Sequence, residues 1–209
     1  AGRPHICYSD FDAKHGRYAY FDGSAWHIQE PDPGNYSGSD CSLALDAQGR
    51  PHIAYYGGSG NLKYAWFDGS TWQLELADPI GGYFTSLALD ASGQPHISHF
   101  DWSNYDLRYA RRSAAGAQGT WEVQLVDGAG IVGDTTSLVL DAAGLPHISY
   151  HGNGDLRYAV FSGTGWLTET VDYGGEVGYY SSQALDGAGR ARIAAHDWDR
   201  ADLRYAYHG

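Results

Sequence analysis

The stretch Pro95-His96-Ile97-Ser98-His99-Phe100 decides the fold, because its opening tripeptide recurs along the chain. Pro-His-Ile also stands at residues 4–6, 51–53 and 146–148, and residues 191–193 carry the altered copy Ala-Arg-Ile. Successive copies are 47, 44, 51 and 45 residues apart. A period of about 40–50 residues means that one supersecondary unit is copied in tandem. Residues shared by all copies therefore build the unit, and function is sought where the copies differ.

Each unit predicts four short antiparallel strands. In one unit, residues 86–90 (Ser-Leu-Ala-Leu-Asp) alternate with the period of two that indicates a strand. The second strand, residues 95–100, opens with Pro, which is tolerated at a first strand position. Residues 106–110 and 121–126 predict the third and fourth strands, and Gly-containing turns join them.

The number of copies predicts the architecture. The second strand recurs near residues 4–9, 51–56, 95–100, 146–151 and 191–196. Four antiparallel strands in about 45 residues are typical of a β-propeller blade, which buries both faces by stacking on its neighbours. We therefore predict an all-β protein: one domain over residues 1–209 that forms a five-bladed β-propeller around a narrow channel.

The two ends of the chain do not complete the pattern. The second and third strands occur five times, but the first and fourth occur only four times. The first and last blades are therefore expected to be incomplete in this chain. Either they stay incomplete, or the chain is a piece of a longer one, or another subunit supplies the missing strands. An incomplete blade has a free edge that can pair with another chain.

The repeated motifs resemble a known family. Units of the form Gly-x-Pro-His-Ile-Ser-Tyr, Asp-Leu-Arg-Tyr-Ala and Ser-Leu-Ala-Leu-Asp look like the highly repetitive bacterial β-propellers. Residues 68–72, Asp-Gly-Ser-Thr-Trp, are similar to the Asp-box turn of sialidase-type propellers, which is structural there. Five blades of this size resemble the tachylectin-like lectins in architecture. The resemblance implies the fold; for function it implies a lectin, an adhesive module or an appendage to an enzyme.

Composition excludes several partners. The chain has 29 Gly, 17 Tyr and a net charge of −12. An acidic surface repels phosphate backbones, so no nucleic acid partner is expected. No apolar run approaches the length of a membrane span. Composition predicts an extracellular or cell-surface location. Cys7 and Cys41 form no Cys-x-x-Cys pair, and they are either disulfide-bonded or two buried thiols.

The repeated histidines and aspartates favour structural roles. The histidines occupy one position of the second strand in different blades, so neighbours should lie more than about 10 Å apart. A metal–nitrogen bond is about 2.0–2.1 Å long, so we expect hydrogen bonds within each blade and neither a metal nor a cofactor. The strand-end aspartates are expected to accept from turn N–H groups; a ring of carboxylates around a cation is the alternative. These residues are His5, His52, His96 and His147, and Asp46, Asp90, Asp141 and Asp186.

Catalytic residues are not expected. Glycoside hydrolysis needs two carboxyl groups that face each other across a sugar. The predicted first strands, which would line the channel, carry no Glu. Glu30, Glu75, Glu122 and Glu169 lie on predicted fourth strands at the outer edge, and Glu176 lies in a loop. A glycosidase is therefore the least favoured of the functions considered.

The loops after the second and fourth strands emerge on one face and differ between copies, which indicates a functional face. Three of the loops after second strands pair a carboxylate with an aromatic ring, and the other two carry Gly57-Gly58 and Gly152-Asn153. The loops after fourth strands lead into further aromatics. The candidate binding residues are Asp10, Phe11, Asp101, Trp102, Asp197 and Trp198, with Tyr83, Tyr179 and Tyr180.

An aromatic ring beside a carboxylate is suited to binding a sugar. The ring stacks on the apolar C–H face, and the carboxylate accepts hydrogen bonds from hydroxyl groups. Weak sites repeated around a ring also gain from multivalency. We therefore predict a non-catalytic recognition propeller whose ligand is a glycan. The alternatives are that these rings pack beneath the loops, and that the protein is a structural propeller that binds a protein partner or self-associates through its incomplete blades.

Overall fold

The computed structural model describes residues 2–34, 38–113 and 119–208, which form 18 strands in five antiparallel sheets. Blade 1 contains β1 (His5–Asp10), β2 (His15–Phe21) and β3 (Trp26–Gln29). Blade 2 contains β4 (Ser39–Leu45), β5 (Pro51–Tyr56), β6 (Leu62–Phe67) and β7 (Trp72–Asp78). Blade 3 contains β8 (Tyr83–Leu89), β9 (Pro95–Asp101), β10 (Asp106–Arg112) and β11 (Trp121–Asp127). Blade 4 contains β12 (Val132–Leu140), β13 (Pro146–Gly152), β14 (Asp155–Phe161) and β15 (Trp166–Asp172), and blade 5 contains β16 (Val177–Leu185), β17 (Ala191–Asp197) and β18 (Asp202–Tyr207).

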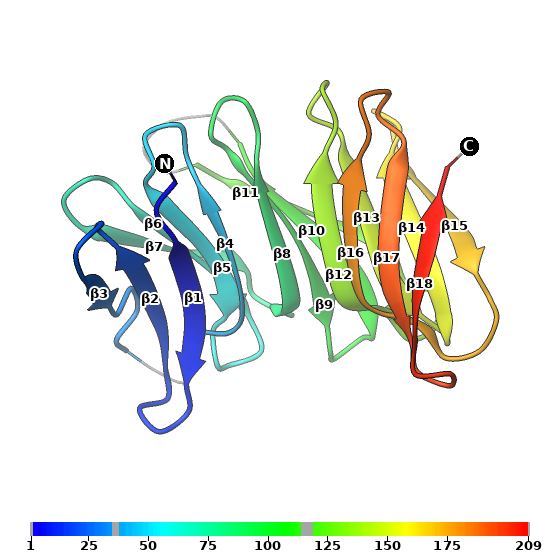
Figure 1. The fold of residues 1–209 in the computed structure, drawn as a ribbon, viewed down its shortest axis with the longest axis horizontal. Coiled ribbons are helices and arrows are strands. Elements are labelled where there is room, and N and C mark those ends of the chain that lie inside the picture. Colours follow the sequence, from blue (N-terminus) through cyan, green and yellow to red (C-terminus); the bar gives the residue numbers. More distant parts are fainter. Residues whose placement is uncertain (1, 35–37, 114–118, 209) are drawn as a thin grey trace.

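The structure contains the antiparallel four-stranded sheets that the repeat predicts. Over the described residues, blades 2, 3 and 4 have four strands, blade 1 has no first strand, and blade 5 has no fourth. The first strands β4, β8, β12 and β16 contact one another in chain order. Blades 1 and 5 lie at opposite ends of the molecule (Figure 1). The five sheets, of which the first and last are incomplete as expected, therefore form an open array, and the described residues do not close a ring.

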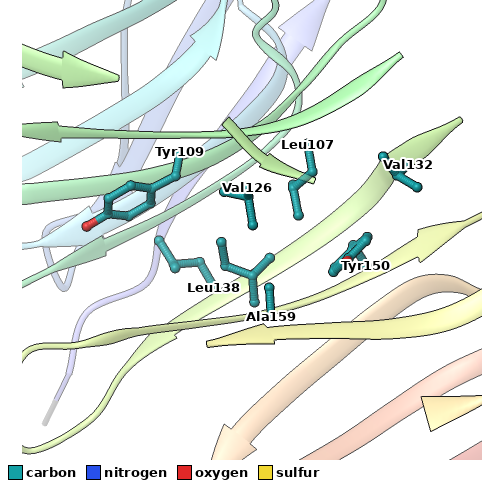
Figure 2. Close-up of a cluster of buried hydrophobic side chains, with 8 residues drawn as sticks. Leu107, Tyr109, Val126, Val132, Leu138, Tyr150 and Ala159 are labelled. Carbon is teal, nitrogen blue, oxygen red and sulfur yellow. The ribbon is translucent and has the colours of Figure 1, made fainter. Parts of the chain in front are cut away.

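The hydrophobic core lies between blades. Between blades 3 and 4, Leu107 and Val126 from one sheet meet Val132 and Tyr150 from the next (Figure 2), and Ile148 belongs to the same cluster. Every residue of β13 is buried, because blades on both sides cover its two faces. In β17 buried residues alternate with half-buried ones, because no blade covers its outer face. Burial thus depends on stacking rather than on the single sheet.

Close approach of the backbones also needs glycine. Gly133 at the start of β12 has a φ of 103°, and a Cβ there would lie 2.7 Å from the Cα of Leu107. A side chain would therefore push blade 4 away from blade 3.

A disulfide joins the first two blades. Cys7 in β1 and Cys41 in β4 are bonded, with their Cα atoms 6.2 Å apart. Of the two alternatives that the sequence left open, the bridge is the one present. Disulfides persist in oxidising environments, so this bond is consistent with an extracellular location. The described part of the chain has no helix that could cross a membrane.

The repeated histidines and aspartates make hydrogen bonds within their own blades, as expected. Nδ1 of His5 lies 2.5 Å from the hydroxyl of Tyr18 in the same blade. His52, His96 and His147 are hydrogen-bonded in the same way to Tyr64, Tyr109 and Tyr158. Oδ1 of Asp90 accepts from the backbone N–H groups of Ser92 and Gln94, at 2.8 Å each. Among the described residues, no group of three or more His, Cys, Asp or Glu side chains is placed to hold a metal ion.

Buried histidines should make stability depend on pH. Burial lowers the pKa of His99, although Asp78 opposes the change, and burial likewise lowers the pKa values of His52, His96 and His147. Below their ordinary pKa of 6.5, the unfolded chain binds more protons than the folded protein does, so stability falls as pH falls. We expect the free energy of unfolding to be lower at about pH 5.5 than at about pH 7.5, measured by urea denaturation.

His99→Gln serves as the control for this pH dependence. Nδ1 of His99 accepts from the N–H of Gly82 at 3.1 Å, and its Nε2 lies 3.3 Å from Oδ2 of Asp78. Glutamine keeps polar groups at this site but does not titrate, so the pH dependence should shrink. A stability that is unchanged or lower at the higher pH would contradict this account.

Candidate functional site

The variable loops gather on one side of the blades. We call this side the loop rim; it consists of the loops that follow the second strands and those that precede the first strands. The former are residues 11–14, 57–61, 102–105, 153–154 and 198–201, and the latter include residues 79–82, 128–131 and 173–176. All nine predicted binding residues lie on the loop rim or at the strand ends beside it.

An aromatic triad lies between blades 2 and 3. The rings of Tyr56, at the end of β5, and Tyr83, at the start of β8, are 4.3 Å apart. The ring of Trp102, just after β9, lies 5.8 Å from Tyr83. Phe100 packs edge-on against Trp102 at 5.7 Å and supports it from below. Trp102 nevertheless remains 55% exposed, so part of it is accessible to a ligand.

A second triad lies between blades 4 and 5. His151, at the end of β13, stacks on Tyr179 of β16 at 3.8 Å. Trp198, just after β17, lies 5.9 Å from Tyr179 and is 61% exposed. His196 packs edge-on against Trp198 at 5.5 Å. Tyr180 extends the exposed aromatic surface beside this triad.

The two triads occupy equivalent positions of the repeat. Each takes one residue from the end of a second strand, one from the start of the next first strand, and a Trp from the loop that follows. The junction between blades 3 and 4 has Asp134 and Asn153 where the triads have Tyr and Trp, and the junction between blades 1 and 2 has Ser39 and Gly58. The triads therefore occur at alternate junctions.

Phe11 stands where Trp102 and Trp198 stand, but it has no triad. It is 86% exposed, and blade 1 has neither a first strand nor a preceding blade to supply the other two rings. Asp10 beside it accepts from the N–H of Ala13 at 3.0 Å and pairs with Arg17 at 3.1 Å. That N–H bond and Arg17 lower the pKa of Asp10.

The other two predicted carboxylates are buried beneath their loops. Asp101 accepts from the side-chain amide of Asn104 at 2.7 Å. Asp197 pairs with Arg204 at 2.7 Å and Arg200 at 3.0 Å. Burial raises the pKa of Asp197, but the hydrogen bonds from both arginines outweigh it and lower the pKa to about 2. These carboxylates hold the loops that present Trp102 and Trp198, and their oxygens are already occupied.

An exposed carboxylate does reach the second triad. The hydroxyl of Tyr179 donates to Oε2 of Glu176 at 3.2 Å, and Nε2 of His151 lies 3.7 Å from the same oxygen. Burial raises the pKa of Tyr179 and lowers that of His151. Glu176 is half exposed, so it can accept hydrogen bonds from a molecule stacked on the rings.

A central cavity opens beside the triads. It has a volume of about 400 Å³, and its lining includes one residue from each first strand: Asp40, Phe84, Thr135 and Tyr180. These four residues have φ values of 51°, 49°, 53° and 50°, in the left-handed region that non-glycine residues rarely adopt. Each marks a break in register between the first and second strands of its blade. The repeated bulge turns these side chains toward the cavity.

Sequence reasoning overlooked two residues of the triads, Tyr56 and His151, and it placed Glu176 in a loop without assigning it to the binding site. Tyr56 and His151 end second strands that otherwise look uniform. Their position is occupied by Ser, Tyr, Phe, His and His in the five copies, which is the variation expected of a functional residue. This signal was present in the sequence but lay inside a predicted strand.

Comparisons with known proteins establish the fold. No protein-family model matches the chain, and no curated protein matches it in sequence. Among solved structures, SapL1 lectin in complex with α-methyl fucoside matches with a TM-score of 0.65 and 12% identity, over 100% of this chain and 76% of that one. The fucose-recognising lectin of Aleuria aurantia, a six-bladed β-propeller, matches with a TM-score of 0.62 and 12% identity, over 99% and 72%. The intramolecular trans-sialidase of Ruminococcus gnavus matches with a TM-score of 0.54 and 16% identity, over 93% and 50%.

At these identities the likeness concerns the fold alone. The chain spans about three quarters of the lectin chains and half of the trans-sialidase chain. Its open array of sheets therefore corresponds to part of a six-bladed ring. The chain has an incomplete β-propeller fold, similar to that of fucose-binding lectins and of sialidases.

Proposed function

We propose that this protein is a non-catalytic, lectin-like propeller that binds glycans at the two aromatic triads of the loop rim. The observation that carries the proposal is the repetition of the triad: Tyr56, Tyr83 and Trp102 at one junction, and His151, Tyr179 and Trp198 at another. The similarity in fold to lectins solved with bound fucosides supports it.

The triads have the chemistry that a sugar needs. An exposed indole offers a flat apolar face on which the C–H groups of a pyranose ring stack. Burial and the hydrogen bond with Tyr56 raise the pKa of Tyr83 to about 12, so its hydroxyl stays neutral, and its oxygen can accept a hydrogen bond from a sugar hydroxyl. At the second triad, Glu176 accepts from sugar hydroxyls. Two sites at alternate blade junctions favour branched or clustered glycans over a single sugar.

Removing both indoles should abolish glycan binding. We expect isothermal titration with methyl α-fucoside to show two sites on the wild-type chain, one site in Trp102→Ala or in Trp198→Ala, and none in the double variant. Stacking is the main apolar contact, and its loss leaves only exposed hydrogen bonds that water replaces. A glycan array then tests whether another sugar binds more tightly than fucose.

Trp26→Ala is the matched control for these variants. Trp26 is also half exposed, but it follows a turn on the opposite side of the blades, so glycan binding should not change. If the array shows no ligand, or if the double variant binds as the wild type does, the proposal is wrong. Turnover of a chromogenic sialoside or fucoside would revive the enzyme alternative.

We further propose one domain over residues 1–209 in an extracellular or cell-surface protein. Stacking continuous from blade 1 to blade 5 and the Cys7–Cys41 bridge support this proposal.

A second role, binding of a protein partner, is favoured by the outer face of blade 5. Leu203 on β18 is 77% exposed, whereas Leu156, at the same position of blade 4, is fully buried by the next blade. Tyr205 and Tyr207 lie exposed beside Leu203. An apolar surface of this kind marks an interaction site.

A further inference from the structure

A tryptophan receptor recurs between successive blades. Trp72, the first residue of β7, donates from Nε1 to Oε1 of Gln29 in the preceding blade at 2.8 Å. Its ring packs edge-on against Tyr18, also of the preceding blade, at 5.4 Å. The receptor therefore consists of a third-strand Tyr and a fourth-strand acceptor, and the following blade supplies the Trp from its fourth strand.

The same arrangement is filled twice more with nearly the same geometry. The donor–acceptor distance is 2.8 Å in both cases, and the ring centroids are 5.3 Å and 5.1 Å apart. The residues are Trp121 on Glu75 and Tyr64, and Trp166 on Gln124 and Tyr109. Glutamine and glutamate both serve as the acceptor.

The fourth receptor, in blade 4, contains no tryptophan. Tyr158 and Glu169 stand at the receptor positions, but within the part of the chain that the structure describes, blade 5 has no fourth strand to fill them. Both residues line two neighbouring cavities of about 370 and 200 Å³, together with Ala191 and His208. The walls of the site are thus built, and space for a large side chain lies between them.

The edge of blade 5 lies next to these cavities. In blades 2 and 4, the residue three positions after the third-strand Tyr pairs with the Trp that opens the fourth strand: Phe67 with Trp72, and Phe161 with Trp166. In blade 5 the corresponding residue is His208, which lines both cavities. A strand that pairs antiparallel with β18, with its first residue opposite His208, therefore directs that residue into the empty receptor.

Trp26 is the equivalent tryptophan of blade 1, and it has no receptor to enter. It opens the fourth strand of blade 1, where no preceding blade exists, and it is exposed. Trp72, Trp121 and Trp166, which have receptors, are only partly exposed. Burial of this Trp thus depends on the preceding blade.

We propose that the free edge of β18 and the Tyr158–Glu169 cavity bind a β-strand from outside residues 1–209, with a tryptophan at its first position. This strand has the chemistry of the repeat's own fourth strands, each of which runs for seven residues from Trp to Asp: Trp72–Asp78, Trp121–Asp127 and Trp166–Asp172. Backbone pairing along the edge supplies affinity, and the tryptophan receptor supplies specificity. The bound strand completes blade 5.

A labelled peptide tests this proposal. The probe is a fluorescein-labelled peptide with the sequence of residues 68–78, Asp-Gly-Ser-Thr-Trp-Gln-Leu-Glu-Leu-Ala-Asp, and binding is followed by fluorescence anisotropy. The matched control peptide has alanine in place of its tryptophan. We expect the tryptophan peptide to bind, and the alanine peptide to bind at least about tenfold more weakly, because the cavity then stays unfilled.

Two substitutions of the exposed residue Glu169 test whether the receptor binds the tryptophan. Glu169→Leu removes the acceptor and should weaken binding by about tenfold, because the buried indole N–H is left without a partner. Glu169→Gln should bind as the wild type does, since Gln29 and Gln124 accept in the filled receptors. Circular dichroism checks that both variants keep the fold.

The proposal fails if neither peptide binds, if both peptides bind equally, or if Glu169→Leu has no effect. Glu169 lies on β15, away from the loop rim, so fucoside binding should be the same in all variants. Failure of this proposal is therefore distinguishable from failure of the glycan proposal.

Discussion

Leu107→Ala should lower the free energy of unfolding by about 2–5 kcal/mol, whereas Leu203→Ala should change it by less than about 0.5 kcal/mol. The two leucines occupy the same position of the third strand, in blades 3 and 5. Leu107 is fully buried against blade 4, so truncation leaves a cavity among packed side chains. Leu203 faces no following blade, so truncation removes few contacts.

Urea denaturation followed by tryptophan fluorescence measures both effects. The slope of the transition should be the same for the two variants, so that a shift in midpoint reports stability. Because the local sequence around both residues is Asp-Leu-Arg-Tyr-Ala, strand propensity is matched and only stacking differs. Equal losses in the two variants would contradict the conclusion that stability resides between blades.

Replacing Cys7 and Cys41 by serine should cost up to about 4 kcal/mol of stability. The bridge closes a loop of 34 residues, and a loop of this length loses that much conformational freedom in the unfolded chain. The loss should be concentrated in blade 1, which has three strands and a neighbour on one side only. Hydrogen exchange should therefore speed up most in β1, β2 and β3.

Reduction of the wild-type protein provides the internal check. Dithiothreitol should lower its denaturation midpoint toward that of the Cys7→Ser/Cys41→Ser variant, and it should leave the variant itself unchanged. A wild-type midpoint that does not respond to the reductant would contradict a stabilising role for the bridge. Faster exchange spread evenly over all blades would contradict the expected concentration in blade 1.

In the proposed binding site, the residues that contact the ligand differ from the residues that hold the loops in place. The carboxylate of Asp101 accepts hydrogen bonds from its own loop, and the carboxylate of Asp197 pairs with Arg204. These contacts keep the neighbouring indoles in position. In the proposed site, the ligand contacts the exposed rings of Trp102 and Trp198, the hydroxyl of Tyr83 and Glu176. In each Asp-aromatic pair of the proposed site, the aspartate holds the loop and the aromatic ring contacts the sugar. Both members are therefore visible as a pair in the sequence, although only the ring touches the ligand.

The repeat determined the strands because its information is local. Alternation within Ser86-Leu87-Ala88-Leu89-Asp90 and the turn chemistry after it act over a few residues, so one copy predicts the others. The hydrogen bonds of His96 and Asp90 also lie within one blade. For the same reason the loops that carry Trp102 and Trp198 were identified from sequence.

The tertiary structure alone decided how the blades meet. Tyr56 and Tyr83 belong to different units, and their rings touch only because two sheets stack at a particular angle. The stacking depends on side chains of both units packing together, as between blades 3 and 4. The cavity beside Tyr158 and Glu169 also depends on contacts between blades. The sequence pattern of a single strand does not show that the tryptophan of the following blade is missing there. Contacts within a unit are thus encoded by short spacing, whereas contacts between units depend on packing that no single repeat contains.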